Sequence, residues 1–116
     1  MKLRWSSFRC ALAGIAHMIR TQRHARWHLL GTLAVAILGF SLHVSGGEWL
    51  ALIVAVALVW TAEAFNTAIE LLGDTITKDK HPLIGHAKDV AAGAVLMAAI
   101  AATLIGGIVL LPKLRA

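Results

Sequence analysis

The sequence is poor in charged residues, in acids and in cysteine, and it has no tyrosine. Charged residues make up 15% of the 116 residues, against about 25% in soluble domains, so the chain cannot cover a water-facing surface. An apolar content of 59% excludes a disordered chain. Cys10 is the only cysteine, which excludes an intramolecular disulfide. The class that remains is an integral membrane protein.

Three long apolar segments are present, and polar segments separate them. About 20 residues of helix cross the hydrocarbon of a bilayer, so we expect membrane spans at about residues 29–47, 49–73 and 88–111. The third is the longest apolar run, and Pro112 ends it. No alternating β pattern is seen, and the predicted fold is an all-α integral membrane protein with one domain over residues 1–116.

The segment at about residues 3–20 has the pattern of an amphipathic helix. Phe8, Leu12, Ile15 and Ile19 share one face, and basic and polar residues occupy the other. We expect this helix to lie on the membrane surface, or alternatively to pack on its neighbours.

Lysine and arginine cluster beside the apolar segments rather than along the whole chain. Six precede Leu29, two close the chain, and three lie between the second and third spans: Lys78, Lys80 and Lys88. The positive-inside rule therefore predicts a cytoplasmic N-terminus. Because the net charge of +5 is explained by topology, we expect no nucleic-acid partner.

Four polar residues share one face of the second span: Glu63, Asn66, Glu70 and Asp74 fall within an arc of about 80°. Ionisable residues inside a membrane are costly and by default mark a functional site. The alternative is that they only pair with bases on neighbouring helices. Glu63 is about 14 Å deeper than Leu72 and suits a general base, whereas Glu70, nearer water, suits a Mg²⁺ ligand.

The segment from Lys78 to Asp89 is expected to form a basic loop with Pro82 and Gly85 as helix breakers. Lysine binds phosphate as a point charge, and a divalent cation bridges phosphate to glutamate, so a loop beside the carboxylates predicts a polyphosphate site. The alternative is a topology signal that contacts lipid headgroups. The remaining histidines have no metal-ligand spacing and are interpreted as interfacial: His17, His24, His28 and His43.

The third span is rich in alanine and glycine, which let membrane helices approach closely. Three spans can scarcely enclose a polar stripe, so we expect a homo-oligomer with sites between subunits.

The chain resembles the small prokaryotic diacylglycerol kinase and undecaprenol kinase family from roughly Phe8 to Pro112. The resemblance rests on three stretches of sequence: Glu63-x-x-Asn66-Thr67-Ala68-Ile69-Glu70-x-x-x-Asp74, His81-Pro82, and Ala87-Lys88-Asp89-Val90-Ala91-Ala92-Gly93-Ala94-Val95-Leu96. It implies a homotrimer in a bacterial inner membrane, with a surface helix and three spans per subunit. It further implies transfer of the ATP γ-phosphate, with Mg²⁺, to the hydroxyl of diacylglycerol or undecaprenol.

The resemblance also assigns roles by position. Glu63 would be the general base on the lipid hydroxyl and Glu70 a metal ligand beside the nucleotide. Asn66 would support the lipid site and Ala92 would border the lipid. The implied ATP contacts are Asp79, Lys80, His81, Lys88 and Asp89.

Three positions depart from the family pattern. Gln22 stands where a glutamate metal ligand is usual, Cys10 replaces an aromatic residue near the nucleotide, and Gly73 replaces a β-branched residue. A carboxamide oxygen still coordinates metal, more weakly than a carboxylate. By position, Gln22 and Cys10 would still lie at the nucleotide, with Gln22 at the metal. None of the departures removes Glu63, Glu70 or Lys88, so we expect activity to survive.

Two other function classes are compatible with part of the pattern. A proton-coupled transporter would use Glu63 for proton exchange but would leave Lys88 and Asp89 without a role. A non-catalytic assembly subunit would explain only the small residues of the third span.

Overall fold

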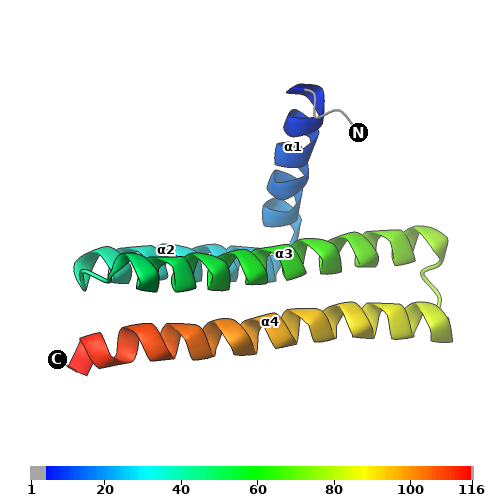
Figure 1. The fold of residues 1–116 in the computed structure, drawn as a ribbon. Coiled ribbons are helices and arrows are strands. Elements are labelled where there is room, and N and C mark those ends of the chain that lie inside the picture. Colours follow the sequence, from blue (N-terminus) through cyan, green and yellow to red (C-terminus); the bar gives the residue numbers. More distant parts are fainter. Residues whose placement is uncertain (1–4, 116) are drawn as a thin grey trace.

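Helices account for every regular element in residues 5–115, the part of the chain that the computed structural model describes (Figure 1). This confirms the all-α prediction. In chain order the helices are α1 (Trp5–Thr21), α2 (Arg23–Ser41), α3 (Gly46–Ile76) and α4 (Pro82–Arg115). The surface helix was expected from about residue 3, and residues 3 and 4 lie outside the described part.

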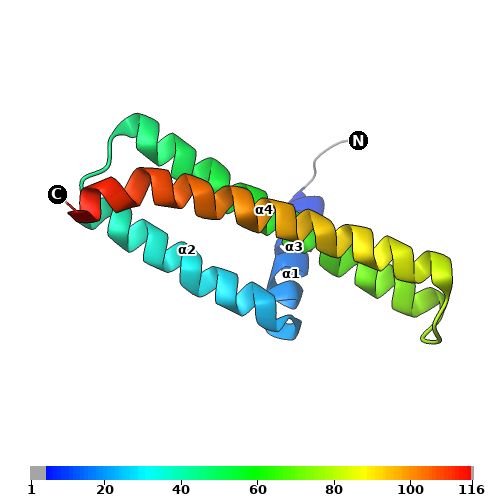
Figure 2. The same cartoon turned by 90° about the horizontal axis from the view of Figure 1, so that it is seen from below.

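The α3 and α4 helices form a long antiparallel hairpin, visible side by side in Figures 1 and 2. Residues 77–81 connect them. Near the connection, Lys88 Nζ lies 2.6 Å from Asp74 Oδ1, and at the far end Lys113 Nζ lies 3.1 Å from Glu48 Oε1. The two pairs show that the helices keep one register along their shared length.

The α2 helix lies beside this hairpin and diverges from it toward α1 (Figure 2). It converges with α3 and α4 at its other end, where a small apolar cluster forms from Val44, Leu52, Val109 and Leu110. The α1 helix stands at a steep angle to the other three (Figure 1) and contacts α2 and α3. The first turns of α2 therefore lie beside the middle of α3, and the hairpin extends beyond them toward the connection (Figure 2).

The α2 helix ends at Ser41, so the turn to α3 falls within the last residues of the span expected at about 29–47. His43 has a φ of 57°, in the left-handed region that breaks a helix. Ser45 then starts α3 with a capping box, in which its hydroxyl accepts from the Glu48 amide and the Glu48 carboxylate accepts from the Ser45 amide. Local capping decides this boundary, not hydropathy.

The α4 helix is longer at both ends than the expected span of 88–111. It begins at Pro82, so the prediction of a loop up to Asp89 with Pro82 and Gly85 as breakers is wrong. Proline is suited to the first helical position, where no amide donor is needed. At its other end the helix continues through Pro112 to Arg115, since a proline near the end of a helix removes only one backbone hydrogen bond.

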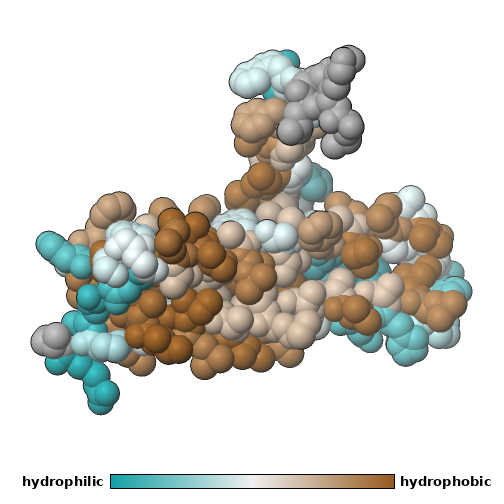
Figure 3. Space-filling model, in the orientation of Figure 1, coloured by the Kyte–Doolittle hydropathy of each residue, from teal (hydrophilic) through white to brown (hydrophobic). Residues whose placement is uncertain are grey.

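Two helices of the described chain, α3 and α4, are long and apolar enough to cross a membrane. The α2 helix does not meet the same requirement: its first turns contain Arg23, His24, Arg26 and His28. Figure 3 shows apolar side chains over the middle of the molecule and hydrophilic ones at both ends. Large apolar side chains are exposed on all four helices, as expected for a surface that lipid or other subunits cover.

Candidate active site

The Glu63 side chain is buried in the middle of α3 and is only 4% exposed as a residue. Its Oε1 lies 3.1 Å from Nε2 of His28 on α2. The hydroxyl of Thr67, also buried, donates to the main-chain oxygen of Glu63 at 2.9 Å and leaves the carboxylate free of that bond. A buried carboxylate with a single imidazole partner is a candidate proton acceptor.

A second group of charges lies farther along α3, toward the connection. Lys88 of α4 places Nζ 2.6 Å from Asp74 Oδ1 and 3.5 Å from Glu70 Oε2. These three side chains are between 27% and 51% exposed, so solutes can reach them from water. We call Glu70, Asp74 and Lys88 the lysine–carboxylate cluster. Glu70 and Asp74 therefore do pair with a base on a neighbouring helix, as the alternative interpretation of the polar face expected.

Gly73 explains how the lysine reaches this position. A Cβ built on Gly73 would lie 2.8 Å from Cε of Lys88, closer than real side chains approach. The glycine therefore lets the lysine stem cross the surface of α3 on its way to Asp74. The departure from the β-branched residue noted in the sequence thus has a packing reason.

Asn66 lies between the two groups, one helical turn from Glu63 and one from Glu70. Its Oδ1 is the one buried side-chain nitrogen or oxygen, within residues 5–115, that has no hydrogen-bond partner. A buried polar atom without a partner is costly, and at a functional site it points to a group that completes it. The carboxamide oxygen is therefore a hydrogen-bond acceptor that the described residues leave unpaired.

The donor set fits a magnesium ion that arrives with phosphates better than a resident ion. No group of three or more histidine, cysteine, aspartate or glutamate side chains in the described chain could hold a metal by itself. Mg²⁺ is commonly held by one or two carboxylates together with substrate phosphates. Glu70, 43% exposed and only loosely engaged by Lys88, is a suitable carboxylate ligand.

The remaining predicted nucleotide residues do not all come together in one chain. Asp79, Lys80 and His81 are exposed in the connection, and Asp89 is exposed on α4 next to the cluster. Cys10 is on α1, and α1 makes no contact with α4 over the described residues. Gln22 lies between α1 and α2, and its side-chain Nε2 donates to Thr21 Oγ1 at 3.4 Å.

Sequence reasoning missed His28, which it grouped with the interfacial histidines. Spacing along one helix does not reveal the pairing, because it joins residues on two antiparallel helices. The nearest signal in the sequence is that His28 begins the first apolar segment, while Glu63 in the second apolar segment has no basic residue beside it.

Comparison with known proteins identifies the relatives of this chain. The family model described as prokaryotic diacylglycerol kinase matches residues 9–110. An undecaprenol kinase of Bacillus subtilis is 40% identical over 95% of this chain and 89% of its own length. A diacylglycerol kinase of Synechocystis is 43% identical over 93% of this chain and 62% of its own length.

A diacylglycerol kinase of Pseudomonas aeruginosa is more distant, at 31% identity over 87% of this chain and 82% of its own length. All three relatives are named as kinases, which favours the kinase over the transporter and the assembly subunit. The chain belongs to the prokaryotic diacylglycerol kinase family and is a lipid kinase.

Proposed function

We propose that this lipid kinase transfers the γ-phosphoryl group of ATP, with Mg²⁺, to the hydroxyl of diacylglycerol or undecaprenol. The observation that carries the proposal is the division of α3 into two parts. A carboxylate is buried at Glu63, and a half-exposed lysine–carboxylate cluster lies beside the basic connection. The first suits a hydroxyl that comes from lipid, and the second suits phosphates that come from water.

The chemical step forms one bond and breaks another. The lipid oxygen bonds to the γ-phosphorus, and the bond from that phosphorus to the bridging oxygen breaks, so that ADP leaves with the electron pair. Glu63 accepts the hydroxyl proton as general base. Bound Mg²⁺ would neutralise phosphate charge, as in other phosphoryl transfers.

The nucleotide end is assigned to the residues around the connection. Lys88 would exchange Asp74 for a phosphate oxygen, since the ammonium group binds either anion as a point charge. Glu70 would hold the metal, with Gln22 a weaker second ligand. The residues assigned to further ATP contacts are Cys10, Asp79, Lys80, His81 and Asp89.

The lipid end is assigned to the bilayer side of the same helices. Asn66 would hold the acceptor hydroxyl near Glu63, and Ala92, exposed on α4, would border the lipid. The product is phosphatidic acid or undecaprenyl phosphate, according to which lipid is accepted.

The proposed setting is the inner membrane of a bacterium, with the N-terminus and the connection in the cytoplasm and α2 as a third crossing. Cys10, on α1, has no contact with α4 within the described chain, which supports sites that form between subunits of a proposed homotrimer. The many exposed apolar side chains support the same assembly.

The test is an assay of the purified full-length protein in lipid nanodiscs with γ-labelled ATP and Mg²⁺. Nanodiscs containing diacylglycerol or undecaprenol are compared with nanodiscs containing neither. We expect label in one of the two lipids, and its loss on chelation of Mg²⁺. Absence of label from both lipids, in a protein that is folded, would overturn the proposal.

A further inference from the structure

The imidazole of His28 is the hydrogen-bond partner that residues 5–115 provide for the Glu63 carboxylate, through Nε2 and Oε1 at 3.1 Å. The imidazole is 28% exposed and the glutamate side chain 6%. An ionised carboxylate only accepts hydrogen bonds, so when Glu63 is ready to act as a base, Nε2–H of His28 donates to it. One carboxylate oxygen is thereby engaged, and Oε2 is left for another partner.

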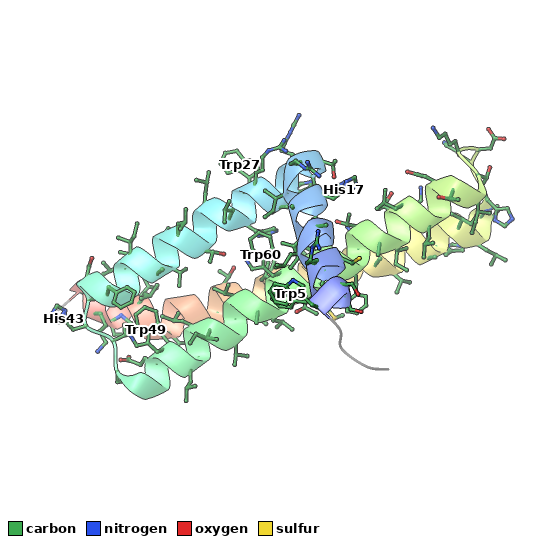
Figure 4. All side chains as sticks on the ribbon, turned by 90° about the horizontal axis from the view of Figure 1, so that it is seen from above. Trp5, His17, Trp27, His43, Trp49 and Trp60 are labelled. Atoms are coloured by element: carbon green, nitrogen blue, oxygen red, sulfur yellow. The ribbon has the colours of Figure 1, made fainter. Side chains whose placement is uncertain are left out.

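A second contact between the same two helices holds the backbone of His28. The Trp60 indole donates to Thr32 Oγ1 at 2.8 Å, and that hydroxyl donates to the main-chain oxygen of His28 at 2.7 Å. Thr32 is one turn after His28, and Trp60 is about one turn before Glu63. Figure 4 shows Trp60 in the space between α2 and α3. The imidazole is thus attached to a backbone that α3 itself holds in place.

His28 lies at the wall of a cavity of about 320 Å³ between α2, α3 and α4. His28, Thr32 and Trp60 all line this cavity, together with small and apolar residues of α4. Glu63 does not line it, so the imidazole lies where the cavity meets the carboxylate. At such a place, an orienting residue controls how the carboxylate faces an incoming group.

We propose that His28 is a positioning residue for Glu63. Its Nε2–H fixes the rotation of the carboxylate so that Oε2 faces the lipid hydroxyl, and the Trp60–Thr32 contact fixes the imidazole in turn. The inference rests on the proposed function of Glu63 as general base. It concerns a residue that has no part in the nucleotide site, and it predicts an effect on turnover rather than on ATP binding.

The first test compares His28→Leu with His28→Gln in nanodiscs. Leucine removes the donor, and we expect kcat to fall by about 10–100-fold while KM for ATP stays within about twofold. Glutamine places an amide N–H near the position of Nε2, and kcat is expected to recover to within about threefold of wild type. His24→Leu, on an exposed position one turn away on the same helix, is the matched control and should behave as wild type.

Each outcome bears on the inference separately from the kinase activity. Wild-type protein that labels neither lipid overturns the proposed function. An active wild type with an equally active His28→Leu variant overturns the role of His28 alone, as does a folded His28→Gln variant no better than His28→Leu. If His28→Leu does not assemble, His28→Met, which has no N–H donor, takes its place.

A second readout does not depend on turnover. Nitrogen NMR of ¹⁵N-histidine-labelled protein reports the hydrogen bond at Nε2 directly. We expect Glu63→Leu to shift the Nε2 resonance of His28 and to leave that of His24 in place. An unchanged His28 resonance would show that the two side chains do not interact, and would overturn the inference.

Discussion

The hairpin of α3 and α4 has a lysine–carboxylate contact at each end, and the two contacts differ in what surrounds them. At the turn end, the Oε1 atom of Glu48 accepts from Lys113 and from the Ser45 amide, and the Glu48 amide is bonded in return. At the connection end, Lys88 is divided between Asp74 and Glu70, and the nearby Oδ1 of Asn66 has no partner. The first set of contacts is complete, whereas the second leaves one acceptor atom unpaired.

A lysine paired with carboxylates therefore has a different role at each end of the hairpin. Exposed ion pairs contribute little to stability, so neither lysine is explained by stability alone. Lys113 closes a capped helix end. Lys88 crosses a glycine to reach two carboxylates, and an incoming phosphate can replace either of them. Both ends carry charged residues. The connection end, where we place the nucleotide, differs because its polar groups are incompletely paired.

The largest effect is expected at Glu63, the one buried carboxylate of the described chain. Glu63→Gln should lower phosphoryl transfer by about 10²–10⁴-fold, the usual contribution of a general base. The thermal unfolding temperature should change little, because the amide oxygen still accepts from His28. The initial rate with labelled ATP is the measurement, and wild-type turnover in the variant would contradict the base assignment.

The two lysines provide the next comparison. Lys88→Ala should raise KM for ATP by at least about tenfold, because a charge-assisted hydrogen bond contributes about 1.5–3 kcal/mol. Lys113→Ala, at the opposite end, is the matched control and should leave KM unchanged. Equal effects of the two substitutions would remove the functional distinction between the ends.

The two glutamates extend this test to the metal. Glu70→Gln should raise the Mg²⁺ concentration for half-maximal activity by about tenfold, since a carboxamide is a weaker ligand for a hard cation. Glu48→Gln should leave the requirement as it is in the wild type. A Mg²⁺ titration of activity measures both, and an unchanged requirement in Glu70→Gln would exclude this residue as a ligand.

The smallest effect is expected from glycine. Gly73→Ala would push the Lys88 stem away from α3, and because that stem is flexible we expect KM for ATP to rise only by about threefold to tenfold. Gly46→Ala, with open space around the added methyl group at the other end of α3, serves as its control. No change in KM for Gly73→Ala would show that the lysine does not need this path.

Helical period was enough to predict the polar face of α3, because residues three, four and seven apart share one side of any helix. Glu70 and Asp74 do lie within reach of one lysine, as that period requires. The amphipathic pattern likewise predicted a helix that the structure has at Trp5–Thr21. These features depend on neighbours along the chain, which the sequence contains.

Features that depend on contacts between helices could not be predicted in the same way. The partner of Glu63 is decided by how α2 lies against α3, and nothing in the spacing of His28 expresses that. The starts of α3 and α4 depend on capping by Ser45 and on Pro82 as a first helical residue, whereas hydropathy indicates only which part of each helix suits lipid.

The shared register of the hairpin restricts where its length can change. An insertion in the connection at residues 77–81 would leave Lys88 opposite Asp74 and Lys113 opposite Glu48. A one-residue deletion in the apolar middle of α3 or α4 would turn everything beyond it by about 100°, and one of the two pairs would be lost. The number of residues in the alanine-rich stretch of α4 is therefore constrained, because it sets the distance between the two ion pairs.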